Sequence, residues 1–223
     1  MITLQKTRSS VRDFMYGMLE EGVSRAHVKK VMVSLRSILS EAVEREWITH
    51  NVALDVKLRR KSRTAEDEKI IPTKDEIRLI IENAPASHRA MFITAIFTGM
   101  RISELRGLTW DCVDFERRVI KVSKRADEFG AMGAPKSRAG VRDIPMTPMV
   151  QETLSAWRSE ALESDLALVF PNGAGRVQNY SNIYNRIFKP MLVQNGIVND
   201  RGEAKFGIHA LRHAAASLFI EQG

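Results

Sequence analysis

Apolar residues recur at helical spacing along the first part of the chain. They predict one helix over residues 10–22 and a longer helix that Ser24 caps and that runs to about Arg45. The apolar stripe of the longer helix consists of Val28, Met32, Leu35, Leu39 and Ala42, and that of the shorter one of Val11, Phe14, Met15, Met18 and Leu19. Residues 47–53 are expected to form a closing turn that tucks Trp47 under both helices.

A second unit begins near residue 72. Thr73 and Glu76 form a predicted capping box ahead of an amphipathic helix. Residues 90–97 predict a buried helix, and Gly99 ends it because glycine adopts positive φ freely. Arg101 then opens a second, short helix.

Strand and helix patterns alternate in the rest of the chain. Period-two patterns predict strands over residues 109–115, 119–122 and 141–146, with a long polar, glycine-containing connection over 124–140. Helices are predicted over residues 148–162, 180–194 and 208–217. We therefore expect a mainly α fold with a small antiparallel β-sheet.

The chain is basic. Its 34 Lys and Arg against 27 Asp and Glu give a formal charge of +7, which favours a polyanionic partner, with nucleic acid ahead of an anionic membrane. Residues 57–63 hold five basic residues in seven and open a charged stretch without apolar periodicity, which predicts a linker. These features divide the chain into a helical domain over residues 1–60, a linker over 61–71 and a second domain over 72–223.

Basic residues of the N-terminal part are candidates for contact with a DNA backbone. They are Arg25, Lys29 and Arg36 on one side of the second helix, and Arg59, Arg60 and Lys61 in the basic run. A solvated surface is the alternative for both groups. It explains the basic residues of the second helix as well as DNA contact does, and it explains the basic run better. With a single cysteine, Cys112, no apolar run of transmembrane length and no signal peptide, a cytoplasmic protein is expected.

Two pairs of polar residues carry candidate chemistry. Arg101 and Glu104 lie three residues apart on one helical face, where the carboxylate can orient a guanidinium suited to gripping two phosphate oxygens. His209 and Arg212 have the same spacing, and an imidazole beside an arginine suits proton transfer at a phosphodiester. Each pair taken alone is also compatible with an ordinary protein surface.

Three motifs together resemble a known family. The sequences T-G-M-R-I-S-E-L around Arg101, K-S-R-A-G-V-R from Lys136 and H-A-L-R-H from His209 resemble, in residue type and order, those of the tyrosine recombinases, the phage-type integrases. Residues 10–60 resemble that family's helical core-binding domain and residues 72–223 the greater part of its catalytic domain. The resemblance implies site-specific DNA integration or recombination through a covalent phosphotyrosyl intermediate, with no metal and no nucleotide cofactor.

The resemblance also implies residue roles. Arg101 and Arg212 would clamp the scissile phosphate, Lys136 would protonate the leaving 5′ oxygen, His209 would assist proton transfer and Glu104 would support Arg101. Lys136 is preferred to Lys124 because it opens the family's K-S-x-x-G-x-R pattern. Lys124 and Arg138 are further candidates for DNA contact.

The chain departs from the family in its tyrosines. The family's nucleophilic tyrosine follows the H-x-x-R box, whereas Tyr16, Tyr180 and Tyr184 all precede His209. We therefore expect a fragment, incomplete at both ends, that binds double-stranded DNA as a monomer without cleaving it, and a full-length protein that assembles as a tetramer on DNA. The alternative is a non-catalytic DNA-binding regulator or decayed integrase that only binds recombination sites.

Overall fold

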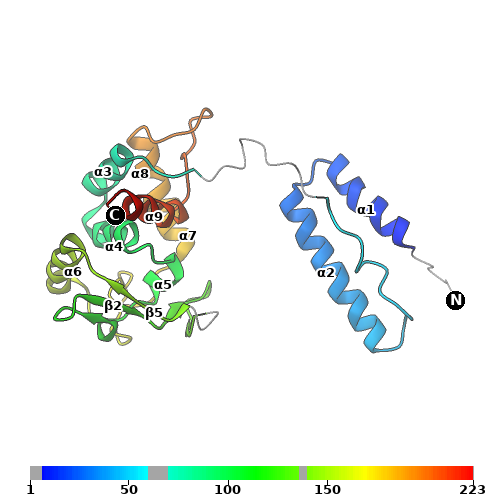
Figure 1. Cartoon of the computed structure of the whole chain (residues 1–223), viewed down its shortest axis with the longest axis horizontal. Coiled ribbons are helices and arrows are strands. Elements are labelled where there is room, and N and C mark those ends of the chain that lie inside the picture. The colour runs from blue at the N-terminus through cyan, green and yellow to red at the C-terminus, as the bar shows by residue number, and fades with distance from the viewer. Residues whose placement is uncertain (1–6, 60–69, 136–139, 223) are drawn as a thin grey trace. The chain divides into compact units, whose positions relative to one another are not determined.

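The computed structural model describes residues 7–59, 70–135 and 140–222, and of residues 216–222 the backbone alone. The chain divides into two compact units, Met1–Glu68 and Lys69–Gly223. Figure 1 shows both units. In the part that the structure describes, no helix is both long enough and apolar enough to cross a membrane.

The first unit is built on two packed helices, α1 (Arg8–Glu20) and α2 (Arg25–Glu44). The Ser24 hydroxyl accepts a hydrogen bond from the His27 amide and so caps α2, as predicted. The predicted stripes supply its core, which consists of Val11, Met15, Val28 and Met32 with Ala53 and Val56 from the following segment. Phe14 departs from the prediction, since it is 49% exposed.

The prediction for Trp47 was wrong. Its side chain is 72% exposed, and the Arg45 guanidinium lies 5.3 Å from the centre of its ring. The turn is closed instead by Asn51, whose amide donates to the Arg36 carbonyl at 2.8 Å and to the Ser40 hydroxyl at 2.9 Å. A short polar side chain anchors this turn, because it reaches both a backbone carbonyl and a hydroxyl of α2.

The second unit surrounds one buried helix, α4 (Ala86–Thr98). The other helices are α3 (Lys74–Asn83), α5 (Ile102–Arg106), α6 (Pro148–Glu160), α7 (Tyr180–Asn182), α8 (Lys189–Gln194) and α9 (His209–Gln222). α4 packs against α3, α5, α6 and α9 (Figure 1). The predicted capping box is present at the start of α3, where Thr73 and Glu76 exchange hydrogen bonds.

A small sheet lies at one end of this helical layer (Figure 1). Strands β1 (Val113–Asp114), β2 (Val119–Val122) and β5 (Arg142–Pro145) form it in the antiparallel order β1-β2-β5. The predicted strand over residues 109–115 is mostly not a strand, because η2 (Trp110–Cys112) is a 3₁₀ turn. The connection 124–140 contains an unpredicted hairpin of β3 (Arg125–Ala126) and β4 (Met132–Gly133).

The predicted helix over residues 180–194 has an irregular centre. A π-helical turn, η4 (Ile183–Phe188), separates α7 from α8. The Lys189 amide donates to the Tyr184 carbonyl, five residues back, as in a π-helix. Pro190 has no amide hydrogen, so it fits only the first turn of a helix, and α8 begins one residue before it. The turn places Ile183 and Phe188 in the core.

Candidate active site

The break between α4 and α5 sets the geometry of the site. Gly99 ends α4 in the left-handed conformation, with φ of +61°, and Arg101 is the N-cap of α5. Glu104 occupies the first turn of α5, and its Oε2 accepts a hydrogen bond from the Arg101 amide at 2.9 Å. The carboxylate therefore both caps the helix and fixes the backbone of Arg101.

The Glu104 carboxylate is buried, with its side chain 2% exposed, and is shared by two arginines. Arg101 Nη1 donates to Oε1 at 2.8 Å. Arg142, on β5, approaches as a fork, with Nη2 2.8 Å from Oε2 and Nη1 3.2 Å from Oε1. The predicted pairing of Arg101 with Glu104 is present, and Arg142 is a partner that the sequence analysis missed.

The electrostatics favour an ionised Glu104. Burial raises the pKa of this carboxyl, but hydrogen bonds from Arg142 and from the amide and side chain of Arg101 outweigh burial and lower the pKa overall. The carboxylate therefore carries its charge at neutral pH. Arg101 itself remains accessible, since its side chain is 51% exposed.

Arg212 joins this cluster from α9. Its guanidinium donates a hydrogen bond to the carbonyl of Gly99. Burial lowers the pKa of Arg212, as do the positive charges of Arg101 and Arg142, whereas Glu104 raises it. Two guanidinium groups therefore bind one carboxylate, and that of Arg212 interacts with the same charges electrostatically. Two positive charges are left without a balancing carboxylate in this cluster, an arrangement suited to binding a doubly charged oxyanion.

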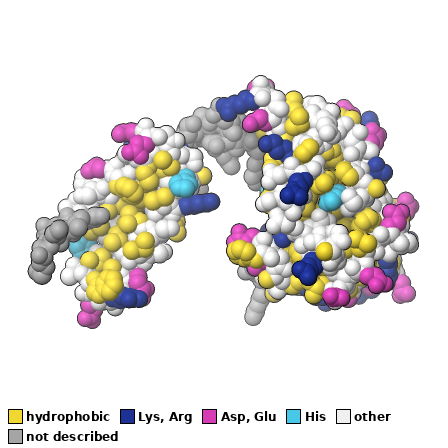
Figure 2. All heavy atoms as spheres, turned by 180° about the vertical axis from the view of Figure 1, so that it is seen from behind, with side chains coloured by type: hydrophobic (Ala, Val, Ile, Leu, Met, Phe, Trp, Pro, Cys, Tyr) yellow, Lys and Arg dark blue, Asp and Glu magenta, His cyan; other side chains and the backbone are white. Residues whose placement is uncertain are grey.

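His209 is exposed at the start of α9, three residues before Arg212. Its ring lies 5.3 Å from that of His213, at an interplanar angle of 90°. His209 and Arg212 therefore lie within one turn of α9, with the imidazole open to solvent. On the face seen in Figure 2, Lys, Arg and His side chains lie among uncharged surface of the larger unit.

The other predicted site residues have varied surroundings. Lys136, Arg138, Arg60 and Lys61 lie outside the described residues. Lys124 does not stand alone: its Nζ lies 2.9 Å from Asp111 Oδ2 and 3.1 Å from the Thr109 hydroxyl. The hydrogen bond with Asp111 raises the pKa of Lys124.

In the first unit, the predicted basic face separates into two kinds of residue. Arg36 is half-buried and donates to the carbonyls of Ala53, at 3.1 Å, and Val56, at 2.6 Å, so it holds the segment after α2 in place. Arg25 donates to the carbonyl of Arg59. Lys29 is exposed on the same helix.

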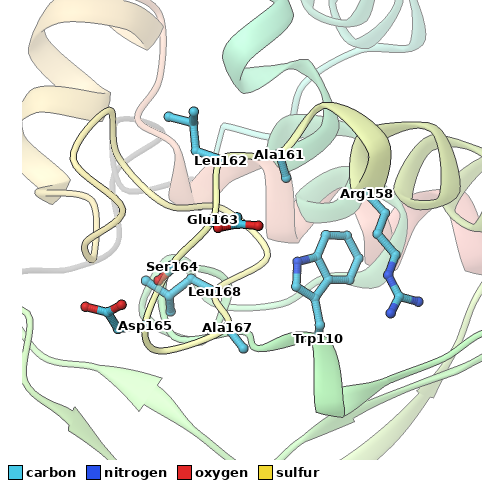
Figure 3. Close-up of a pocket in the computed structure, with 9 residues that line it drawn as sticks. All are labelled: Trp110, Arg158, Ala161, Leu162, Glu163, Ser164, Asp165, Ala167 and Leu168. Carbon is cyan, nitrogen blue, oxygen red and sulfur yellow. The ribbon is translucent and has the colours of Figure 1, made fainter.

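A cavity of about 410 Å³ lies elsewhere in the second unit, at the end of α6 (Figure 3). Its lining combines the Arg158 guanidinium, which lies 5.5 Å from the centre of the Trp110 ring, with Glu163 and Asp165. Charges of both signs and an indole give it no preference for an oxyanion, and neither Arg101 nor Arg212 lines it.

Comparison with known proteins adds the family. A model of the phage integrase family matches residues 69–223. A tyrosine recombinase XerC-like protein of Caldanaerobacter subterraneus is 26% identical over 232 residues, covering 92% of this chain and 58% of that protein. The ICEBs1 integrase of Bacillus subtilis is 24% identical over 234 residues, covering 97% of this chain and 60% of that protein. The chain thus spans about three fifths of the length of these relatives.

Solved structures share the fold. An integrase of the Tn1549 transposon, in complex with a circular intermediate DNA, superposes with a TM-score of 0.79 at 22% identity, covering 98% of this chain and 74% of that one. A lambda integrase dimer bound to a COC′ core site superposes with a TM-score of 0.71 at 20% identity, covering 99% of this chain and 59% of that one. The mainly helical fold with its small antiparallel sheets is shared with these proteins, and the family model spans the whole of the second unit. The chain belongs to the phage integrase family.

Proposed function

We propose that the chain acts in site-specific DNA recombination, in which strands are cut and rejoined through a covalent phosphotyrosyl intermediate. The observation that carries this proposal is that Arg101 and Arg142 both bind the buried Glu104, while Arg212 binds the backbone of Gly99, two residues before Arg101. A protein that only binds DNA needs positive charge, but it does not need an arginine whose backbone and side chain are both fixed by one carboxylate. The named relatives are recombinases and integrases, which agrees with this function.

The placement of Arg101 and Arg212, together with the family's motifs, supports the following course of reaction. Arg101 and Arg212 bind the non-bridging oxygens of the scissile phosphate and balance the charge that grows as a tyrosine oxygen adds to phosphorus. The tyrosine proton passes to a base, a role that suits the exposed His209. The bond from phosphorus to the 5′ oxygen then breaks, and Lys136 supplies the proton to that oxygen.

The tyrosines of this chain do not suit the nucleophile. Tyr180 and Tyr184 stack on each other with ring centres 6.2 Å apart, and burial raises the pKa of Tyr180, which disfavours its phenolate. Tyr16 lies in the first unit, on α1. We therefore assign the nucleophile to the portion of the relatives' length that this chain does not span.

The first unit is proposed to bind the DNA backbone. Lys29 is its clearest candidate, because it is exposed, and Arg25 and Arg59 are further candidates. Arg60 and Lys61 follow Arg59 directly in the sequence and belong to the same proposal. Domains of residues 1–60 and 72–223 joined by a basic linker would let the chain grip a duplex at two places. Assembly as a tetramer on paired sites and action on DNA in the cytoplasm belong to the same proposal.

The test uses the protein encoded by the whole gene and a DNA site selected from a random duplex library. A nick beside the cut position lets the released strand diffuse away, so a covalent protein–DNA adduct accumulates and survives denaturant. We expect such an adduct from the wild-type protein. Tight, site-specific binding without any adduct would contradict the recombinase and favour a regulator that only binds recombination sites.

Matched variants test the clamp. Arg101→Ala and Arg212→Ala are expected to lower the rate of adduct formation by at least about a hundredfold, the cost of removing a charge-stabilising donor. Arg117→Ala removes an equal charge from the exposed turn between β1 and β2, and its adduct rate should stay near the wild-type value. Equal losses from all three variants would show that charge alone matters.

A further inference from the structure

Arg142 closes the K-S-x-x-G-x-R pattern that begins at Lys136, but its distance along the chain from Arg101 and Glu104 predicts no role for it in the clamp. It lies on β5 opposite Val122, and its side chain is 28% exposed. Its two terminal nitrogens meet the two oxygens of Glu104, and Nη1 also donates to the Gly140 carbonyl at 3.1 Å. Two parallel hydrogen bonds of this kind fix the plane of a carboxylate, which a single donor cannot do.

We propose that Arg142 is a positioning residue, which fixes the Glu104 carboxylate so that Glu104 in turn orients Arg101 toward the phosphate. This inference rests on the proposed function, because it assigns a role within the same phosphate-binding site. Arg142 acts from the sheet, whereas Arg101 and Glu104 belong to α5, so the sheet and the helix must keep their relative placement for the clamp to form.

Arg101 needs a fixed partner if its guanidinium is to keep one orientation. Its side chain is long and half exposed, and its guanidinium donates a hydrogen bond to Glu104 Oε1. A carboxylate free to rotate would let this guanidinium adopt several orientations. Phosphate binding would then have to restrict it to one of them, at a cost in conformational entropy. With Arg142 in place, Oε2 is held by Arg142 and the Arg101 amide, so Oε1 has one position.

Burial of Glu104 makes the second arginine more important. A carboxylate that is 2% exposed is stable only when its charge is paired and its oxygens are hydrogen-bonded. Arg101 is partly turned to solvent and would be drawn toward a bound phosphate. Arg142 keeps Glu104 charged when Arg101 moves toward the phosphate, because Arg142 stays hydrogen-bonded to Glu104 whether or not Arg101 contacts the phosphate.

The test measures the binding of inorganic phosphate to the chain itself. Phosphate is titrated into ¹⁵N-labelled protein, and the amide signals of Ile102 and Ser103, in the first turn of α5, report on binding at the site. Arg142→Lys keeps the charge but removes the fork, and Arg142→Met removes both. Arg117→Lys and Arg117→Met are the matched controls on the exposed turn of the same sheet.

We expect both Arg142 variants to weaken phosphate binding by about tenfold, the effect of losing one charge-assisted hydrogen bond, and both Arg117 variants to bind as the wild type does. Arg142→Lys binding as tightly as the wild type would overturn the inference, because charge alone would then suffice. Should Arg142→Met fail to fold, as judged by circular dichroism, the Lys variant still decides the question.

A double-mutant cycle separates positioning from direct contact. In an Arg101→Met background, Arg142→Lys should cause little further loss, because its effect passes through Arg101. Additive losses would show that Arg142 binds phosphate directly and would overturn the positioning role. A wild-type chain that shows no saturable change at α5 would refute the phosphate site itself, and with it the proposed function, whatever the variants do.

Discussion

The carbonyl oxygen of Gly99 accepts a hydrogen bond from the guanidinium of Arg212, 113 residues later in the sequence. Gly99 lies two residues before Arg101, so this bond ties the last helix to the N-cap of α5. An added Cβ at Gly99 would lie 3.3 Å from the Cβ of Ala215, on the same helix as Arg212. The two arginines of the proposed clamp therefore share one backbone junction.

Gly99→Ala tests this junction. The variant places a Cβ in the left-handed conformation and also pushes against α9, so we expect it to lose about 2 kcal/mol of unfolding free energy. Gly196→Ala is the control, because Gly196 has φ of +70° and nothing within 4 Å of an added Cβ. Urea unfolding should show the larger loss for Gly99→Ala, and only this variant should weaken phosphate binding. Equal losses would mean that the contact with Ala215 contributes nothing.

Gly107→Ala tests how the hairpin is joined to α5. An added Cβ at Gly107 would lie 2.6 Å from the carbonyl carbon of Arg125, a backbone atom that no side-chain rotation can move. We expect a loss of about 3 kcal/mol or more in unfolding free energy, measured in urea. Gly133→Ala, on the neighbouring strand, meets nothing within 4 Å and should cost less than half as much.

Glu104→Gln tests the buried carboxylate through pH. The folded-state pKa of Glu104 lies below its ordinary value of 4.5, so its stabilisation is fully present above about pH 4.5 and is lost as the pH falls through the folded-state pKa. At pH 7 the variant should be about 1–3 kcal/mol less stable than the wild type, because the paired arginines lose their counter-charge.

The difference between the two proteins should shrink as the pH is lowered from 5 to 3, as followed by urea unfolding at each pH. Glu160→Gln, an exposed change at the end of α6, should differ from the wild type by the same small amount throughout. A gap for Glu104→Gln that stays constant down to pH 3 would contradict the ion pairing.

Lys29 and Arg36 form a matched pair in the first unit. Arg36→Met removes hydrogen bonds to two backbone carbonyls and should destabilise that unit by about 1–3 kcal/mol. Lys29→Met should leave stability unchanged and reduce by about 0.9 the slope of log affinity for DNA against log salt, the value for one lost phosphate contact. Thermal unfolding and salt-dependent DNA binding measure the two effects. The structural role assigned to Arg36 is contradicted if Arg36→Met is as stable as the wild type.

Local signals predicted the helical part of the fold well. Thr73 with Glu76, and Ser24 ahead of α2, are capping residues whose effect acts within one turn, so a single sequence reveals them. Gly99 was predicted to end α4 for the same local reason. The hairpin of β3 and β4 was not predicted, because strands of two residues are too short to show alternation. Residues 109–115 were predicted as a strand because their alternation also fits a 3₁₀ turn followed by a short strand.

The site was only partly visible in the sequence. The spacing of Arg101 and Glu104 predicted their pairing, but Arg142 is 38 residues from Glu104 and no spacing rule joins them. One signal was available: on β5, Arg142 lies on the same face as the buried Ile144, whereas Asp143 is exposed. An arginine on the inward face of a strand requires a buried partner of opposite charge. Its position therefore predicts an acidic residue near the core.

The π-helical turn fixes the length of its segment. A π turn holds about one residue more than an α turn, so removing one residue between Ile183 and Phe188 would restore regular α-helix. It would also rotate α7 by about 100° relative to α8. Tyr180 would swing away from its present direction while Met191 and Leu192 stayed in the core. This stretch should therefore not tolerate the loss or gain of a single residue, even where the side chains that remain are unchanged.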